Sequence, residues 1–422
     1  MTTPLFVCGA ECGVDVIGVA QPTGSLRHWS AVDAGFVRSS ALTAGAWSAF
    51  SYLILQLSAG TADGATHTFP TAISSGGTIV ARFRFRIDSL TDAQARTVFS
   101  TPDGLAGVRV VRADAFGGHN LTTWAGNATA DSDTVALISI ETWYLIDITI
   151  TRGTTITTTC QINGGAVGSA TSSKTGQTAT TIPGFRLGSN TSGTGGNTST
   201  VVAAYIDDLC VSGTAGDYPI GDGRGEALYP DADGVHVYTN ATDFKRNNST
   251  NVATPPSAET STWSNLQNPL DDAIGLWMAQ TLSAAGNYLE WLFEPLTNGV
   301  TINGLAVVSS HHSSTTGANT QSLRLEDTQT ENAILALVDY SDVTVSFNYD
   351  MYATSPRTGL PWKHGDVNNI RVRWGYSTDI VGVPYIDGVC LEVDYVPGTP
   401  PSDRLPTCLV LPVQAVHRAS RW

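Results

Sequence analysis

The chain has 422 residues, of which 41% are hydrophobic and 14% are charged, and its formal net charge at pH 7 is -15. An acidic surface repels phosphate backbones, so this charge argues against nucleic acid as a partner. The 42 glycines and the small share of charged residues are typical of short strands joined by turns, and they argue against helical bundles. We therefore expect an all-β protein.

The first residues and the apolar segments argue against a membrane location. The first seven residues lack the basic and apolar regions of a signal peptide, and no window is long enough to span a bilayer. Cys8 and Cys12 have no histidine near them, so their spacing fits no common zinc pattern. We expect no membrane insertion, no bound cofactor, reduced cysteines and synthesis in a cytoplasm.

The clearest strand in the first half of the chain covers residues 78–87. Its apolar and polar residues alternate with a period of two, which places Arg82, Arg84 and Arg86 together on one face of the strand. Three arginines on one face would suit an acidic ligand. We favour the alternative, a solvated sheet face with acidic neighbours, because antiparallel sheets commonly keep one face wet.

Further strands are expected at residues 142–151, 155–162 and 201–211, and Asn163-Gly164 is a strong hairpin signal. The motifs in this region are Trp143-Tyr144-Leu145-Ile146-Asp147, Gln161-Ile162-Asn163-Gly164-Gly165, Phe185-Arg186-Leu187-Gly188 and Tyr205-Ile206-Asp207-Asp208-Leu209-Cys210. In this order they resemble the second half of a concanavalin A-like, laminin-G-type jelly roll. The resemblance is good for residues 140–211 and loose for residues 1–139. It implies a jelly-roll domain over residues 1–216.

Glycine and proline are dense between residues 213 and 234. Because glycine permits positive φ and proline fixes φ, we interpret residues 217–238 as a linker between two β domains. The motif Gly221-Asp222-Gly223-Arg224-Gly225-Glu226, placed directly after such a domain, resembles structural proteins of tailed bacteriophages. In those proteins a second β domain follows. The resemblance implies a virion protein of the tail, fibre or head-decoration type.

A second β-sandwich domain is expected over residues 239–397, with sequence patterns typical of strands at 288–293, 343–349 and 385–395. Residues 362–395 again resemble the closing strands of the second β domain in phage tail and fibre proteins. Residues 398–422 contain too much proline for a domain, so we predict an extended C-terminal tail for docking. The expected fold is thus all-β, with two β-sandwich (jelly-roll) domains, a linker and a tail.

Two acidic pairs are candidates for catalytic or metal-binding groups. Glu290 and Glu294 stand four residues apart on an expected strand, which separates them by roughly 13 Å, farther than the two carboxylates of glycoside hydrolysis. We therefore expect no catalytic residues and no enzyme activity. Asp207 and Asp208 are the candidates for a calcium site of the kind that some laminin-G-type domains carry.

One aromatic residue is a candidate for ligand binding. Trp124 would stack on a sugar ring if it were exposed, and a place in the hydrophobic core is the alternative. A glycan contact there would make the first domain a receptor-recognition module for host surface glycans.

The expected function is that of a non-enzymatic structural component of a bacteriophage virion. Its partners would be copies of itself and other virion proteins. The expected assembly contacts are Leu5 and Phe6 near the start of the chain and Leu409, Leu411 and Trp422 in the tail, which would add to neighbouring sheets. The alternatives are the glycan-binding module and, behind it, a polysaccharide depolymerase.

Overall fold

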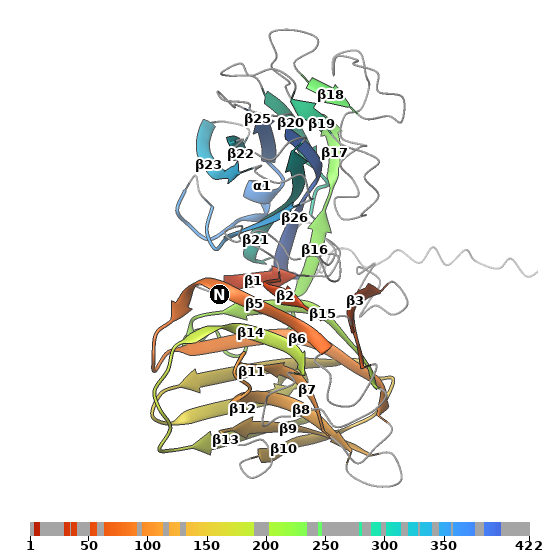
Figure 1. Cartoon of the computed structure of the whole chain (residues 1–422), viewed down its shortest axis with the longest axis vertical. Coiled ribbons are helices and arrows are strands. Elements are labelled where there is room, and N and C mark those ends of the chain that lie inside the picture. The colour runs from red at the N-terminus through yellow and green to blue at the C-terminus, as the bar shows by residue number, and fades with distance from the viewer. Residues whose placement is uncertain are drawn as a thin grey trace, which may run out of the picture.

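The computed structural model describes residues 4–8, 29–33, 35–39, 51–56, 63–90, 95–112, 118–126, 132–189, 202–233, 244–246, 278–280, 288–296, 301–313, 320–327, 330–339, 346–355, 358–375 and 384–397. In these residues there are 26 strands, a four-residue α-helix and two short 3-10 helices. The strands form two sandwiches, one above the other in Figure 1. The expected all-β class with two β-sandwiches is confirmed.

The first sandwich has an eight-stranded and a seven-stranded sheet. The first sheet contains β1 (Pro4–Cys8), β3 (Phe36–Ser39), β4 (Ser51–Gln56), β6 (Thr78–Leu90), β11 (Tyr144–Arg152), β12 (Ile156–Ile162), β13 (Gly168–Lys174) and β15 (Val202–Ser212). The second sheet contains β2 (Ala31–Val32), β5 (Asp63–Ile73), β7 (Ala95–Ser100), β8 (Ala106–Arg112), β9 (His119–Ala125), β10 (Ser132–Ile138) and β14 (Ile182–Ser189). The 3-10 helix η1 (Asn163–Gly165) turns the chain from β12 to β13, at the predicted hairpin signal.

The strand order of the first sandwich is that of a jelly roll. Consecutive strands β5 and β6 lie in opposite sheets, and so do β14 and β15. The late strands then pair with the early ones, since β14 lies beside β5 and β15 lies beside β6. Double sheets with such crossing connections define the jelly-roll architecture, so this expectation for the first domain is confirmed.

The second sandwich has a six-stranded and a five-stranded sheet. The six-stranded sheet contains β16 (Arg224–Leu228), β18 (Phe244–Arg246), β19 (Met278–Gln280), β21 (Thr301–Ser313), β24 (Ser346–Tyr352) and β26 (Pro384–Val396). The other contains β17 (Pro230–Asp233), β20 (Tyr288–Phe293), β22 (Thr320–Asp327), β23 (Thr330–Asp339) and β25 (Ile370–Gly375). Helices η2 (Ala215–Asp217) and α1 (His364–Val367) lie in connections.

Part of the stretch interpreted as a linker is strand. β16 pairs with β26 and β17 pairs with β20, so residues 224–233 supply one strand to each sheet of the second sandwich. In Figure 1, β16 leads from the first sandwich into the second. The described residues without strand structure between β15 and β16 are 213–223.

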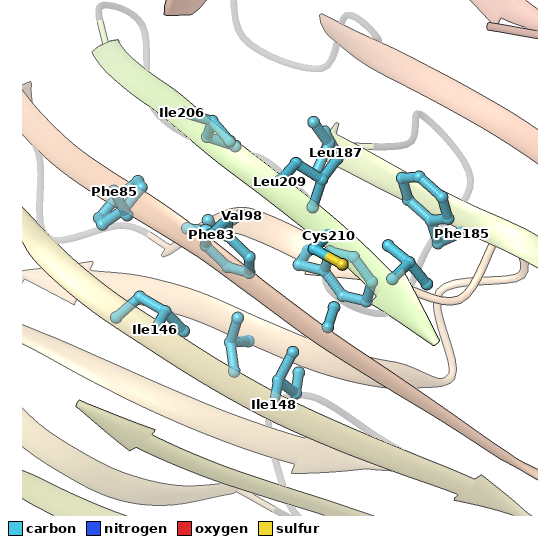
Figure 2. Packing of buried hydrophobic residues seen from close by; sticks show 14 of the residues in the cluster. Phe83, Phe85, Val98, Ile146, Ile148, Phe185, Leu187, Ile206, Leu209 and Cys210 are labelled. Atoms are coloured by element: carbon cyan, nitrogen blue, oxygen red, sulfur yellow. The ribbon is translucent and has the colours of Figure 1, made fainter. Parts of the chain in front are cut away.

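The core of the first sandwich follows from the alternation in β6. Phe83 and Phe85 are fully buried, and they pack with apolar residues of β11, β14 and β15 (Figure 2). Leu187, Leu209 and Cys210 lie in the same cluster. The five apolar positions of residues 79–87 are all buried, as the period of two predicts.

The cysteines depart in part from the expected reduced state. Cys8, Cys160 and Cys210 are buried and form no disulfide, and burial raises the pKa of the Cys160 and Cys210 thiols. A buried free cysteine acts as a small hydrophobic residue. Cys390, however, is disulfide-bonded, so the prediction of reduced cysteines is wrong there.

Candidate functional site at the domain junction

The centre of the six-stranded sheet of the second sandwich, at β21 and β26, is buried on both faces. Leu305 and Val307 of β21 belong to the core of the second sandwich. The alternate residues Ala306 and Val308 belong to the core cluster of the first sandwich, together with Cys390 of β26. One hydrophobic cluster therefore crosses between the domains. We call this region the domain junction: β1, and the residues of β6, β15, β21, β24 and β26 that face it.

The short strand β1 lies in the middle of the junction (Figure 1). It pairs antiparallel with the end of β15, with Phe6 opposite Val211 and Val7 opposite Cys210. The side chains of Phe6, Val7 and Cys8 are at most 1% exposed. The expected role of Phe6 as a contact to a neighbouring subunit is therefore corrected: its ring is enclosed within its own chain.

Aromatic rings from both domains surround Phe6. Its ring centroid lies 4.6 Å from that of His67, 5.2 Å from those of Trp29 and Phe185, and 5.3 Å from that of Tyr349. Tyr349 belongs to β24 of the second sandwich, whereas the other rings belong to the first. Aromatic pairs at such separations contribute about 0.5–1.5 kcal/mol each beyond the area that they bury.

The Tyr349 hydroxyl also satisfies the outer edge of β1. The Val7 backbone N–H donates to Tyr349 Oη at 2.8 Å, and the hydroxyl donates to the Val7 carbonyl oxygen at 2.8 Å. Burial raises the pKa of Tyr349 well above its ordinary value, so the hydroxyl keeps the proton that it donates. One side chain of the second domain thus replaces a neighbouring strand at Val7.

A second polar contact joins the domains at Cys8. Its sulfur lies 2.7 Å from Tyr52 Oη, and its S–H donates to Glu392 Oε1 at 3.5 Å. Glu392 belongs to β26 and is 1% exposed. Burial raises the pKa of the Tyr52 hydroxyl, which therefore remains protonated beside this carboxylate.

A buried ion pair between Arg82 and Asp394 links the two domains across the junction. Both side chains are 0% exposed. Asn303 of β21 completes the group, since its Nδ2 donates to Asp394 Oδ1 at 2.9 Å. The expected solvated face of β6 is therefore wrong at Arg82, because the second sandwich covers that position.

The other two arginines of β6 have acidic neighbours. Arg84 Nε lies 3.0 Å from Asp208 Oδ2, and its Nη2 lies 2.5 Å from Asp222 Oδ1. Arg86 pairs with Asp88 at 2.5 Å and is partly exposed. The arginine face of β6 thus extends from the partly exposed Arg86 to Arg82, which is buried in the domain junction.

The two calcium candidates, Asp207 and Asp208, accept hydrogen bonds from backbone N–H groups near the junction. Asp208 Oδ1 accepts the Gly225 N–H at 2.8 Å, and its other oxygen pairs with Arg84. Asp207 Oδ1 accepts the Asp208 N–H at 2.8 Å. Among the residues that the structure describes, no group of three or more His, Cys, Asp or Glu is arranged to hold a metal ion.

Asp147 of β11 fixes the chain between the domains in a similar way. Its Oδ1 accepts the backbone N–H groups of Ile220 and Gly221 at 3.0 and 3.1 Å. These bonds attach the glycine-rich connection to the body of the first sandwich.

The roles of Asp147, Tyr349, Glu392 and Asp394 were not predicted from the sequence. Two acids alternating with buried apolar residues in 389–394, opposite the arginine face of β6, were a signal that could have found the last two.

Trp124 is a core residue. Its side chain is 0% exposed, and its Nε1 donates to the Gly104 carbonyl oxygen at 3.1 Å. No face of the ring is open to a sugar, which corrects the expected glycan contact. Leu5 is partly buried against the hydrophobic cluster that contains Phe6, and Leu409, Leu411 and Trp422 lie outside the described residues.

Glu290 and Glu294 are the two carboxylates at which the sequence predicts no catalytic pair. Glu290 is fully buried on the five-stranded sheet, where Arg371 Nη1 lies 2.8 Å and Arg373 Nε lies 2.5 Å from its oxygens. Glu290 thus forms ion pairs with two arginines of the neighbouring strand β25. Glu294 is exposed and accepts the Tyr229 N–H at 3.5 Å.

Within the described part of the chain, no helix has the length and apolarity needed to cross a membrane.

Comparison with known proteins gives structural likenesses alone. No family model matches the chain, and no curated protein matches it. Among solved structures, an alginate lyase from Aplysia kurodai is 8% identical, with a TM-score of 0.30 over 43% of this chain and 87% of that one. The cellulose induced protein Cip1 is 12% identical, with a TM-score of 0.32 over 50% of this chain and 97% of that one. The binding domain of botulinum neurotoxin serotype D is 11% identical, with a TM-score of 0.27 over 65% and 70% of the two chains. Likenesses this distant carry no argument about function.

Proposed function

We propose that this protein is a non-enzymatic structural component of a bacteriophage virion that works through protein–protein contacts. It would be synthesised in the host cytoplasm and built into the particle beside copies of itself and other virion proteins. The observation that carries the proposal is the domain junction. Its buried rings, hydrogen bonds and ion pair hold two sandwiches in one fixed arrangement.

A fixed arrangement is what a repeating assembly requires of its subunits. Two domains of one chain usually move relative to each other unless their interface is large and hydrophobic. Here a continuous hydrophobic cluster spans the interface, and the Arg82–Asp394 pair adds a partner-specific contact. Symmetric assemblies repeat one contact geometry many times. If the junction were mobile, deviations in the relative orientation of the two domains would accumulate from one contact to the next along the particle.

Imaging intact particles tests the proposal directly. We expect density for both sandwiches, in the relative orientation of Figure 1, at symmetry-related positions of the particle. Purified particles that lack this chain and are fully infectious would refute the proposal. Glycan-array binding or release of reducing ends by the purified chain would instead favour the receptor-binding or depolymerase alternative.

The junction should matter for incorporation. A phage carrying Arg82→Ala should incorporate less of this chain into particles than the wild type. Arg86→Ala is the matched control, because the Arg86–Asp88 pair lies on the same strand and is partly exposed. Equal incorporation of both variants would contradict the role of a rigid junction.

A further inference from the structure

We propose that Asn163 is a site of spontaneous modification, at which the backbone nitrogen of Gly164 attacks the side-chain amide and water converts it to a carboxylate. Both residues lie in η1, the turn between β12 and β13, on the side of the first sandwich away from the second (Figure 1). Asparagine is among the chemically labile residues of proteins. The reaction needs only this chain and water, so it does not depend on the proposed function.

The nucleophile is the backbone nitrogen of Gly164, which lies at the surface. Asn163 and Gly164 are both exposed, so hydroxide from the solvent reaches the Gly164 N–H. A Cβ added at Gly164 would meet no atom within 4 Å, so the space around this residue is open. Backbone hydrogen bonds that close the turn come from the N–H groups of Ala166 and Val167, at 3.2 and 3.4 Å.

The side-chain amide of Asn163 is held through its oxygen. The Leu145 backbone N–H donates to Asn163 Oδ1 at 2.8 Å. Negative charge develops on this oxygen when a nucleophile attacks the amide carbon, and a backbone donor already placed there stabilises that charge, as in an oxyanion hole. The hydrogen bond thus holds the oxygen, which stays, and not the amide nitrogen, which departs.

The reaction consumes water and releases ammonia, without any oxidation or reduction. The Gly164 nitrogen gives its proton to hydroxide and forms a bond to Asn163 Cγ. The Cγ–Nδ2 bond then breaks, and ammonia leaves with a proton from water, so that hydroxide is regenerated and a cyclic imide remains. Water adds to either carbonyl of the imide and opens the ring to aspartate or isoaspartate. Either product adds one negative charge to the turn.

The same dipeptide in the second sandwich supplies an internal comparison. Asn303-Gly304 lies in β21, where Gly304 is paired with Asp394. Asn303 is 7% exposed, and its Nδ2 donates to Asp394 Oδ1 at 2.9 Å. Burial excludes hydroxide, and the hydrogen bond retains the nitrogen that would have to leave, so we expect this pair to persist in the folded chain. A third pair, Asn298-Gly299, lies outside the described residues.

Peptide mapping of the aged full chain tests the site. The folded chain is kept in mildly alkaline buffer, and samples are digested and analysed by mass spectrometry. Trypsin releases residues 153–174, a peptide whose only asparagine is Asn163. We expect this peptide to convert with time to an aspartate and an isoaspartate form. Asn303 should convert at least roughly 10-fold more slowly, the factor expected when one hydrogen bond must first be broken.

Two controls separate the effect of the fold from that of the dipeptide. In guanidinium chloride both pairs should convert at similar rates, because unfolding removes the difference in burial. Asn163→Gln lengthens the side chain and disfavours ring closure, so residues 153–174 of this variant should remain unconverted. Equal rates at Asn163 and Asn303 in the folded chain would overturn the inference. Conversion of Asn163 in guanidinium chloride but not in the folded chain would overturn it as well.

Discussion

Removal of one partner of the Arg82–Asp394 pair is the sharpest test of the junction. Arg82→Ala leaves Asp394, which is 0% exposed, with Asn303 Nδ2 as a neutral donor and without the opposing charge of Arg82. Breaking a buried pair in this way costs about 3–5 kcal/mol, because the remaining charge stays desolvated. Replacing both partners, in Arg82→Met/Asp394→Leu, should recover most of that loss.

Urea unfolding followed by tryptophan fluorescence measures these differences. Fully buried tryptophans report on both domains, Trp29 and Trp124 in the first and Trp291 and Trp374 in the second. We expect one transition for the wild type and a loss of about 3–5 kcal/mol, or a split into two transitions, for Arg82→Ala. Arg86→Ala, at a partly exposed pair, should cost less than about 1 kcal/mol. If the two single variants lost equal stability, the reasoning about burial at the junction would be refuted.

Three further predictions concern single side chains. Tyr349→Phe removes both hydrogen bonds to buried Val7, so unfolding in urea should show a loss of about 1–3 kcal/mol, and a loss no greater than that of an exposed tyrosine would contradict the edge-capping role. Burial raises the pKa of Asp350 to about 6, so the folded state holds its proton more tightly and stability falls as pH rises from about 4 to 6. Asp350→Asn should therefore gain up to about 3 kcal/mol at pH 7 and almost nothing at pH 4, and unfolding curves that shift equally at both pH values would rule this out. Trp124→Ala should cost about 3–5 kcal/mol by thermal or urea unfolding, since the ring is fully buried, and a variant of wild-type stability would place the ring outside the core.

Local patterns in the sequence were sufficient to predict the strand β6 and the turn after β12. The alternation in residues 78–87 predicts which side chains are buried, and the structure buries all five apolar ones. The hairpin signal at Asn163-Gly164 likewise lies at the turn between β12 and β13. These features depend on neighbours within a few residues, so a sequence pattern contains them.

The junction depends on contacts that no local pattern contains. Arg82 looked solvated because the alternation of β6 shows a polar face, but not what lies on that face. Val7 owes its edge hydrogen bonds to a tyrosine 342 positions away. Trp124 was open to two interpretations, because a tryptophan in a strand packs in a core or binds a ligand, and the indole hydrogen bond to Gly104 shows which.

Charge complementarity between two distant strands is the pattern that a closer comparison of the halves would have found. The polar face of β6 carries arginines at 82, 84 and 86, and the strand at 384–396 carries Glu392 and Asp394 among buried apolar residues. When both faces of such a strand are buried, the carboxylates on its acidic face need charged or hydrogen-bonding partners, because an unpaired buried charge is costly. The arginine face of β6 meets that requirement at one position, Arg82, where the second sandwich covers it. Asp394 of β26 thus joins the hydrophobic cluster and the Tyr349 hydrogen bonds in holding the second sandwich on the first.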